Sequence, residues 1–202
     1  MPENGAKETA RLEAFSDGVF AIAMTLLALE LKDPRVDAAT AGSLAKALLN
    51  QWPSYLAFFT SFFTVLVMWV HHHAIFRQVQ KVYVRLLFAN GFLLLLITAV
   101  PFPTAIVAQY LRTPAASVAS GLYAGLFFLI SIAFYLLLMA AFRESTLDPA
   151  ASPETVERFR RDYKLGPPLY LLAAAAAPFS AWLSLGICTA LWIFWAVSTR
   201  EC

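Results

Sequence analysis

The sequence predicts an all-α integral membrane protein with six transmembrane helices in each subunit, and two observations support this fold. The first is composition: of 202 residues, 60% are hydrophobic and 14% are charged, whereas a soluble domain usually carries about 25% charged residues. The second is the spacing of the charges. Asp, Glu, Lys and Arg are absent from four long stretches, which cover residues 47–76, 86–111, 113–142 and 165–199.

Each of the first three uncharged stretches is long enough for one membrane crossing, because a helix crosses the hydrocarbon layer in about 20 residues. The fourth is too long for one crossing, so we expect a helical hairpin with a turn near residues 180–185, between Pro178 and Gly186. Between the uncharged stretches, residues 32–51 are predicted to hold a short outer helix. Residues 154–164 are predicted to form a charged surface helix that begins after Pro153.

A sixth helix is expected near the N-terminus, where residues 18–29 lie uncharged between Asp17 and Glu30. A spanning helix with charged ends is expected to face protein or water rather than lipid. The chain is predicted to form a single domain, residues 1–202. Its six predicted spans are about residues 12–31, 53–76, 84–110, 115–142, 165–181 and 184–199.

Lysine and arginine predict the orientation, because they gather on the cytoplasmic side of membrane proteins. With the N-terminus inside, eleven of the 15 basic residues fall at the inner ends of the predicted spans and four at the outer ends. We therefore expect a multi-pass protein of the plasma membrane with both termini in the cytoplasm.

The sequence offers little support for an enzyme or a nucleic-acid-binding protein. It has no Walker loop, dinucleotide fingerprint, zinc-finger spacing or G-x-S-x-G elbow. His71, His72 and His73 suggest a metal site, but neighbours on a helix point about 100° apart and do not converge on one ion. We therefore expect no metal, no cofactor and no catalytic residue. The expected surroundings are membrane lipid and further copies of the chain.

The N-terminal helix carries an apolar stripe. At 100° per residue, with Ile22 at zero, Leu26 falls at about 40°, Leu29 at about −20° and Thr25 at about −60°. This stripe is consistent with ordinary packing against another helix. If identical copies surround an axis, the same stripe lines a narrow apolar pore, which large aliphatic rings can gate by dewetting.

Asp17 falls near 220° on the same projection, on the other side of the helix. An ionisable group inside a membrane protein needs partners, so a structural hydrogen-bonded network is expected here in preference to direct ion contact. The candidate partners are Arg11, Ser16 and the polar end of the second span. A histidine from that end is expected to bond Asp17 or Asn90.

Four sequence elements occur together in a specific order: Arg11 followed by Phe15-Ser16-Asp17, Trp69-x-x-His72-His73-x-x-Phe76, Asn90, and Pro101-Phe102-Pro103-Thr104. In these elements the chain resembles the prokaryotic transmembrane protein 175 family, relatives of the lysosomal and endosomal potassium channel, over essentially its whole length. The resemblance implies a six-span homotetramer whose first helices line the pore. It implies that Ile22 is the narrowest point, followed by layers at Thr25, Leu26 and Leu29. The structural polar network is expected to contain Arg11, Phe15, Ser16, Asp17, Trp69, His72, His73 and Asn90.

The function expected from these observations is passive conduction by a potassium-selective channel, with K⁺ as the permeant ion and hydrophobic rings of the first helix as the gate. The alternative is a proton- or cation-coupled secondary transporter that uses Asp17 and the histidines at 71–73 as a relay.

Overall fold

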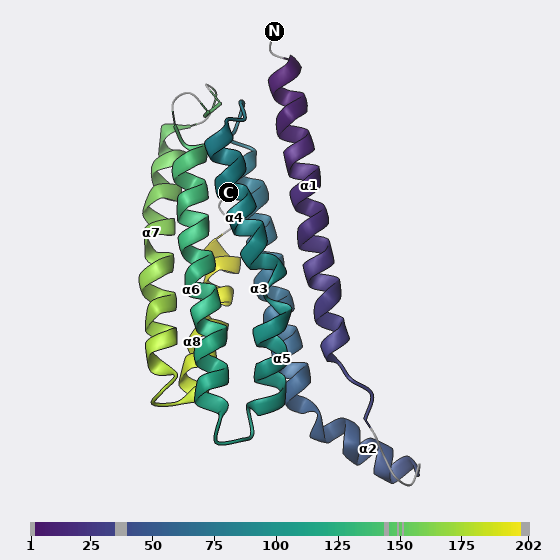
Figure 1. Ribbon diagram of the computed structural model, residues 1–202. Coiled ribbons are helices and arrows are strands. Elements are labelled where there is room, and N and C mark those ends of the chain that lie inside the picture. The colour runs from purple at the N-terminus through teal and green to yellow at the C-terminus, as the bar shows by residue number, and fades with distance from the viewer. Residues whose placement is uncertain (1–2, 35–39, 144–145, 149, 151, 199–202) are drawn as a thin grey trace.

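The computed structural model describes residues 3–34, 40–143, 146–148, 150 and 152–198, and this part of the chain is built of helices (Figure 1). The elements are α1 (Glu3–Leu27), the short 3₁₀ helix η1 (Ala28–Glu30), α2 (Ala41–Asn50), α3 (Trp52–Phe76), α4 (Val84–Thr98), α5 (Pro101–Tyr110), α6 (Ala116–Ala141), α7 (Pro153–Ala176) and α8 (Ala181–Ser198).

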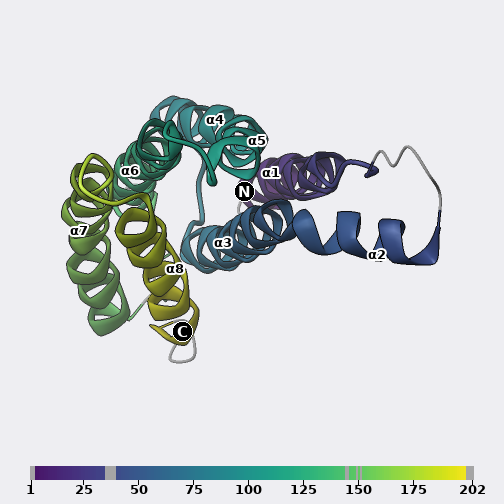
Figure 2. The same ribbon diagram turned by 90° about the horizontal axis from the view of Figure 1, so that it is seen from below.

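The long helices lie side by side in one bundle, with α1 at one edge and α7 at the other (Figures 1 and 2). Helix α6 packs on α4, α5, α7 and α8, with one side left exposed. Helix α1 packs mainly on α3 and α4. Helix α2 projects away from the bundle at the end opposite the N-terminus. The expected short helix within residues 32–51 is therefore present.

Five helical segments of the described chain are long and apolar enough to cross a membrane: Glu8–Glu30, Trp52–Phe76, Val84–Tyr110, Ala116–Ala141 and Ala181–Ser198. They agree with the first, second, third, fourth and sixth predicted spans. The all-helical, multi-pass class is thereby confirmed. Helix α1 extends beyond its predicted start, since it begins at Glu3.

The third predicted span is two consecutive helices. The first, α4, ends at Thr98, and α5 begins at Pro101. Proline lacks a backbone N–H and so cannot continue the hydrogen-bond ladder of the preceding helix. Pro101 and Pro103 both lie in the first turn of α5, where those donors would have no intrahelical partner.

The predicted bounds of the fifth span, residues 165–181, are wrong. Helix α7 runs unbroken from Pro153 to Ala176, so the charged segment at 154–164 is its first half rather than a separate surface helix. Pro167 and Pro168 lie inside it. The turn to α8 occupies residues 177–180, earlier than predicted, and Gly186 lies within α8. The apolar part of α7, residues 165–176, is shorter than an ordinary span, which needs about 20 residues.

Close packing between α6 and α7 explains why α7 stays helical through its prolines. A Cβ atom at Gly166 would lie 3.4 Å from Ser131 Cβ, and one at Gly121 would lie 3.4 Å from Ala177 Cβ. Small residues let helix backbones approach closely inside membranes. Val156, Phe159, Tyr163 and Tyr170 of α7 are also buried, at helical spacing. Tertiary contacts along the whole helix therefore stabilise α7.

Candidate functional site

Helix α1 has one covered and one uncovered face. Ser16, Phe20, Ala23 and Leu27 are at most 1% exposed, and their spacing of four, three and four residues places them on a single side of the helix. They anchor α1 to the bundle. The opposite side of α1 contacts no other part of the described chain closely enough to be buried.

The uncovered face contains the stripe that the sequence predicts. Ile22 is 57% exposed, Leu26 40% and Leu29 70%, and Thr25 is exposed as well. The hydroxyl of Thr25 donates to the carbonyl oxygen of Ile22 at 2.8 Å. Since that bond satisfies its donor within the helix, Thr25 fits an otherwise apolar surface and keeps its oxygen available as an acceptor.

A chain of hydrogen bonds fastens the covered face of α1 to its neighbours. Asn90 of α4 donates from Nδ2 to Ser16 Oγ at 2.9 Å, and Ser16 Oγ donates to the carbonyl of Leu12 at 2.8 Å. The Asn90 Oδ1 atom lies 2.8 Å from His72 Nε2. Because Asn90 Oδ1 can only accept, His72 Nε2 is the donor of this bond. Ser16, His72 and Asn90 are all buried, so the chain joins α1, α3 and α4 by direct contacts in the interior of the bundle.

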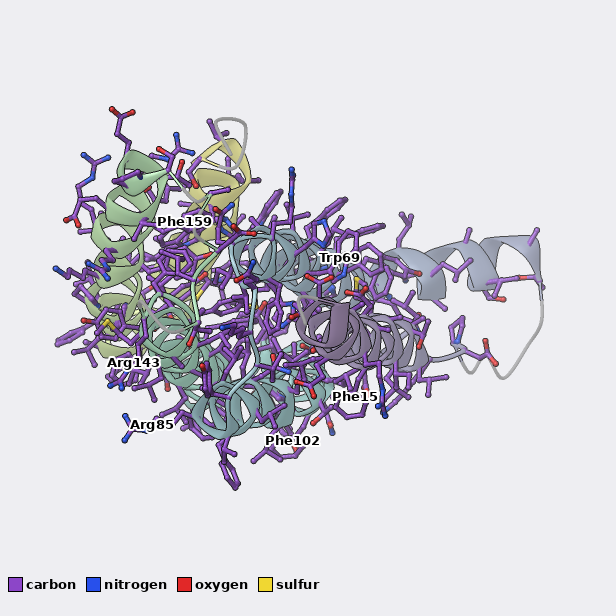
Figure 3. The ribbon with its side chains drawn as sticks, turned by 90° about the horizontal axis from the view of Figure 1, so that it is seen from above. Phe15, Trp69, Arg85, Phe102, Arg143 and Phe159 are labelled. Atoms are coloured by element: carbon purple, nitrogen blue, oxygen red, sulfur yellow. The ribbon has the colours of Figure 1, made fainter. Side chains whose placement is uncertain are left out.

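A second polar contact lies beside this chain. Trp69 Nε1 donates to Asp17 Oδ1 at 2.8 Å, which links α3 to α1. Trp69 is labelled in Figure 3, on the helix next to α1. The ring of His73 stacks on Trp69 with centroids 6.3 Å apart, but His73 itself is exposed. Asp17 therefore faces the neighbouring helix rather than the uncovered face.

The structure thus brings together five of the eight residues expected in the polar network, in two contacts: Ser16 with Asn90 and His72, and Asp17 with Trp69. His73 adds a ring contact only. Arg11 is exposed and Phe15 is 64% exposed. Figure 3 shows Phe15 at the edge of α1 away from Trp69. Within a single subunit, Arg11 and Phe15 therefore lie outside the polar network.

The three histidines have separate surroundings. His71 is buried on the side of α3 away from α1. There the hydroxyl group of Tyr163, from α7, donates a hydrogen bond of 2.8 Å to His71 Nδ1. His71 Nε2 lies 3.2 Å from the carbonyl of Trp195 in α8. Each ring nitrogen of His71 therefore binds protein. Within the described residues, no three His, Cys, Asp or Glu side chains lie together as a metal site would require.

Comparison of the sequence and the structure with known proteins identifies the family. A family model described as the endosomal/lysosomal potassium channel TMEM175 matches residues 11–101. A protein of Chamaesiphon minutus named as a potassium channel is 49% identical over 194 residues, which is 96% of each chain. The chain belongs to the TMEM175 family. A Streptomyces collinus protein, also named as a potassium channel, is 40% identical over 201 residues, 96% of this chain and 97% of that one.

A solved TMEM175 structure has the same fold. The crystal structure of a lysosomal potassium-selective channel TMEM175 homologue from Chamaesiphon minutus superposes with a TM-score of 0.87, at 47% sequence identity, over 96% of this chain and 98% of that chain. The human endosomal/lysosomal proton channel TMEM175 is similar over a shorter stretch. It is 47% identical over 77 residues, which is 35% of this chain and 15% of the human one.

This chain also contains a buried hydroxyl cluster that its sequence does not predict. Ser61 Oγ lies 2.8 Å from Thr104 Oγ1 and 3.1 Å from Tyr123 Oη, and Thr104 Oγ1 donates to the carbonyl of Val100 at 2.8 Å. These bonds join α3, α5 and α6 in the buried interior. The sequence shows a polar residue in each of three apolar helices, and Thr104 belongs to the Pro101-Phe102-Pro103-Thr104 element, but neither signal reveals that the three side chains meet.

Proposed function

We propose that this chain is the subunit of a potassium-selective channel in which four copies surround an axis and α1 of each copy lines the pore. The observation that supports this function best is the uncovered apolar face of α1. In a single subunit, Ile22 and Leu29 are more than half exposed, on a helix whose other face is fixed to the bundle by buried polar bonds. Copies of the chain related by a closed rotation would bring these faces together.

The gate in this proposal is apolar. Rings of Ile22, Leu26 and Leu29 offer no ligand to a hydrated cation, and removing water from an ion without replacement is very costly. Such a constriction conducts when it widens and wets. Potassium holds its water less tightly than sodium, so partial dehydration penalises potassium less. This mechanism gives a modest preference for K⁺ without a cage of carbonyl oxygens.

The polar contacts beneath α1 have a positioning role in this proposal. A pore-lining helix leaves most of one side without protein partners, so its orientation depends on the other side. The chain from Ser16 through Asn90 to His72, and the bond from Trp69 to Asp17, fix both the rotation and the height of α1 against α3 and α4. Arg11 and Phe15, exposed in one subunit, are proposed to complete the network between subunits.

We also propose six crossings, with both termini in the cytoplasm of a plasma-membrane protein. Helix α7 lies alongside the five candidate spans and extends over the height of the bundle (Figure 1). Six crossings place both termini on one side. Arg85 and Arg143 lie at the end that Figure 3 views. The prevalence of basic residues at that end supports its assignment to the cytoplasm.

Coupled transport by an Asp17–histidine relay receives less support. Asp17 contacts Trp69, His72 contacts Asn90, and His71 contacts Tyr163 on the other side of α3. These contacts do not form one continuous path. Passive proton conduction is the second candidate function, because the human relative is named as a proton channel.

The test is reconstitution into liposomes with flux measured under a K⁺ gradient, a Na⁺ gradient and a proton gradient in turn. The proposal expects flux down the K⁺ gradient without any coupled ion, a smaller Na⁺ flux, and no dependence of the K⁺ flux on a proton gradient. Potassium movement that occurs only when a second gradient drives it would identify a transporter instead. Proton flux larger than K⁺ flux would favour the second candidate.

A further inference from the structure

Helix α2 is a short helix that leaves the bundle. It is ten residues long, and an isolated helix of that length is marginal in water. Yet its N-terminus is well built: Thr40 Oγ1 accepts from the Ser43 backbone N–H at 3.2 Å, and Ser43 Oγ accepts from the Thr40 N–H at 3.0 Å. None of its residues is buried. A helix formed in this way requires a surface that one subunit does not provide.

Most of the apolar residues of α2 share one face. Leu49, which is 75% exposed, lies at the edge of this face, about 140° from Leu44, and Ala47 lies about 60° to the other side of Leu44. Taking Leu44 as zero at 100° per residue, Leu48 falls at about 40°, Ala41 at about 60° and Ala45 at about 100°. Leu44 is 44% exposed and Leu48 41%. Lys46, Asn50 and Ser43 fall between about 200° and 260°, on the opposite face. The helix is therefore amphipathic, with an unpartnered apolar side.

Two observations favour a protein surface over lipid as the partner of this face. Helices that lie in a membrane interface usually have a strongly charged polar side, whereas Lys46 is the single charge on α2. The apolar face of α2 alternates leucine with alanine, and small residues between larger ones are typical of close helix–helix contact.

The position of α2 favours a second copy as the protein partner. Helix α2 projects on the side of the bundle where α1 stands (Figure 1). Seen along the bundle, α1 lies between α2 on one flank and α5 on the other (Figure 2). Phe102 of α5, which is 63% exposed, lies on that second flank in Figure 3. In a closed ring, one flank of each copy meets the opposite flank of the next.

We infer that α2 is an intersubunit arm, whose face of Ala41, Leu44, Ala45 and Leu48 packs on the adjacent copy of the chain at the outer rim of the assembly. This inference rests on the proposed ring of copies around α1. It adds a contact outside the membrane-spanning helices, so that the outer ends of neighbouring α1 helices are joined through α2 as well as at the axis.

The test places a spin label at one position of α2 at a time, through Leu44→Cys, Leu48→Cys, Lys46→Cys or Asn50→Cys. The background is Cys188→Ala and Cys202→Ser, and the protein is in liposomes. Collisions with oxygen report lipid, and collisions with a water-soluble nickel chelate report water. Labels at 44 and 48 are expected to collide with oxygen several-fold less often than a label at Leu172→Cys, an exposed apolar position of α7. They are also expected to collide with nickel several-fold less often than labels at 46 and 50. Labels at 46 and 50 should collide with nickel.

The outcomes separate the arm from its alternatives. High oxygen collision at 44 and 48 would mean that α2 lies in the lipid interface, and high nickel collision would mean a free arm. Either result overturns the inference. The mass of the unlabelled protein by light scattering is measured first. A single-subunit mass would overturn the proposed function as well, whereas a multi-subunit mass with lipid-exposed labels would overturn the arm alone.

A second measurement does not depend on labels. The double variant Leu44→Asp/Leu48→Asp should lose assembled protein on size exclusion, while Lys46→Asp, on the opposite face of α2, should not. Circular dichroism checks that the double variant keeps its helices. A folded double variant that assembles as well as the unaltered chain would contradict the arm.

Discussion

Helices α1 and α6 are both apolar and long enough to cross a membrane, but a larger share of α6 is buried within the subunit. In an apolar stretch of 18 residues, 44% of the residues of α6 are buried within the subunit, against 22% of those in the segment Glu8–Glu30, which contains α1. Helix α6 packs on its neighbours through Phe127, Ile130 and Leu137, which are at most 1% exposed. Helix α1 leaves Ile22 and Leu29 largely uncovered.

The difference indicates what each helix does. Helix α6 is held by apolar packing on several sides, so the free energy of folding of the subunit depends on it. Helix α1 is held on one side, partly by polar side chains that meet inside an apolar bundle. Its other side contributes little to the stability of a single subunit, so packing within the subunit does not constrain the residues there.

The largest expected effect on conduction is at Ile22. In Ile22→Asn an amide can replace part of the water that a cation loses at the constriction. If this lowers the barrier by about 1.4 kcal/mol, a value within the range for one hydrogen bond, flux rises about tenfold. The preference for K⁺ over Na⁺ should fall, since dehydration then matters less. Liposome flux under the two gradients measures both changes.

The matched control for Ile22→Asn is Leu172→Asn, an exposed apolar position on α7 at the far edge of the bundle from α1. Phe20 is unsuitable, because it is fully buried against His72 and its replacement would disturb the fold. Unchanged flux and selectivity in an assembled Ile22→Asn channel would remove Ile22 from the conduction path.

The largest expected effect on stability is in α6. Leu137→Ala removes a fully buried side chain and leaves a cavity, for which we expect a loss of about 2–5 kcal/mol in the free energy of unfolding. Ile22→Ala removes a similar volume from an exposed site and should change it little. Thermal unfolding of the two variants in the same detergent measures the contrast. Equal destabilisation would show that α1 is packed as tightly as α6.

Asp17 should matter less than Leu137 for stability and less than Ile22 for selectivity. Asp17→Leu removes the acceptor of the Trp69 Nε1 bond, and interhelical hydrogen bonds in membranes contribute about 0.6 kcal/mol on average, up to about 1.7. Asp17→Asn keeps an acceptor oxygen and should lose less. In both variants the K⁺ to Na⁺ flux ratio of the assembled protein should stay unchanged, so an altered ratio in either would place Asp17 in contact with the ion.

Sequence periodicity could predict the faces of α1, because its covered residues and its stripe both follow the helical repeat over several turns. It could not predict α7. The charges at 154–164 and the pair Pro167–Pro168 suggest a surface helix followed by a break. The continuous helix results from contacts that distant segments supply, such as Gly166 against Ser131 of α6.

The polar site was predictable to a similar extent. Ser16, Asp17, His72 and Asn90 could be selected as polar side chains in or beside apolar helices, and Trp69 was expected from the resemblance to the family. Their pairing could not, since Asn90 and Ser16 lie 74 positions apart and only the packing of α1 on α4 brings them together. The same limit applies to His71, which resembles its neighbours in sequence but binds Tyr163, 92 positions away.

The smallest expected effect is at that His71–Tyr163 contact, which lies outside the region that the proposed pore involves. Tyr163→Phe keeps the ring, and with it the contacts to Phe159 and Trp195, but removes the hydroxyl that donates to His71 Nδ1. His71 retains its bond to the Trp195 carbonyl, so we expect a loss of about 0.6 kcal/mol in the free energy of unfolding and no change in the K⁺ to Na⁺ flux ratio. Tyr135→Phe, on α6, is the control, because the Tyr135 hydroxyl has no hydrogen bond within the described residues. If Tyr163→Phe altered the flux ratio while Tyr135→Phe did not, the α7–α8 side of the subunit would influence conduction, and the division between a pore-lining α1 and a purely supporting outer bundle would fail.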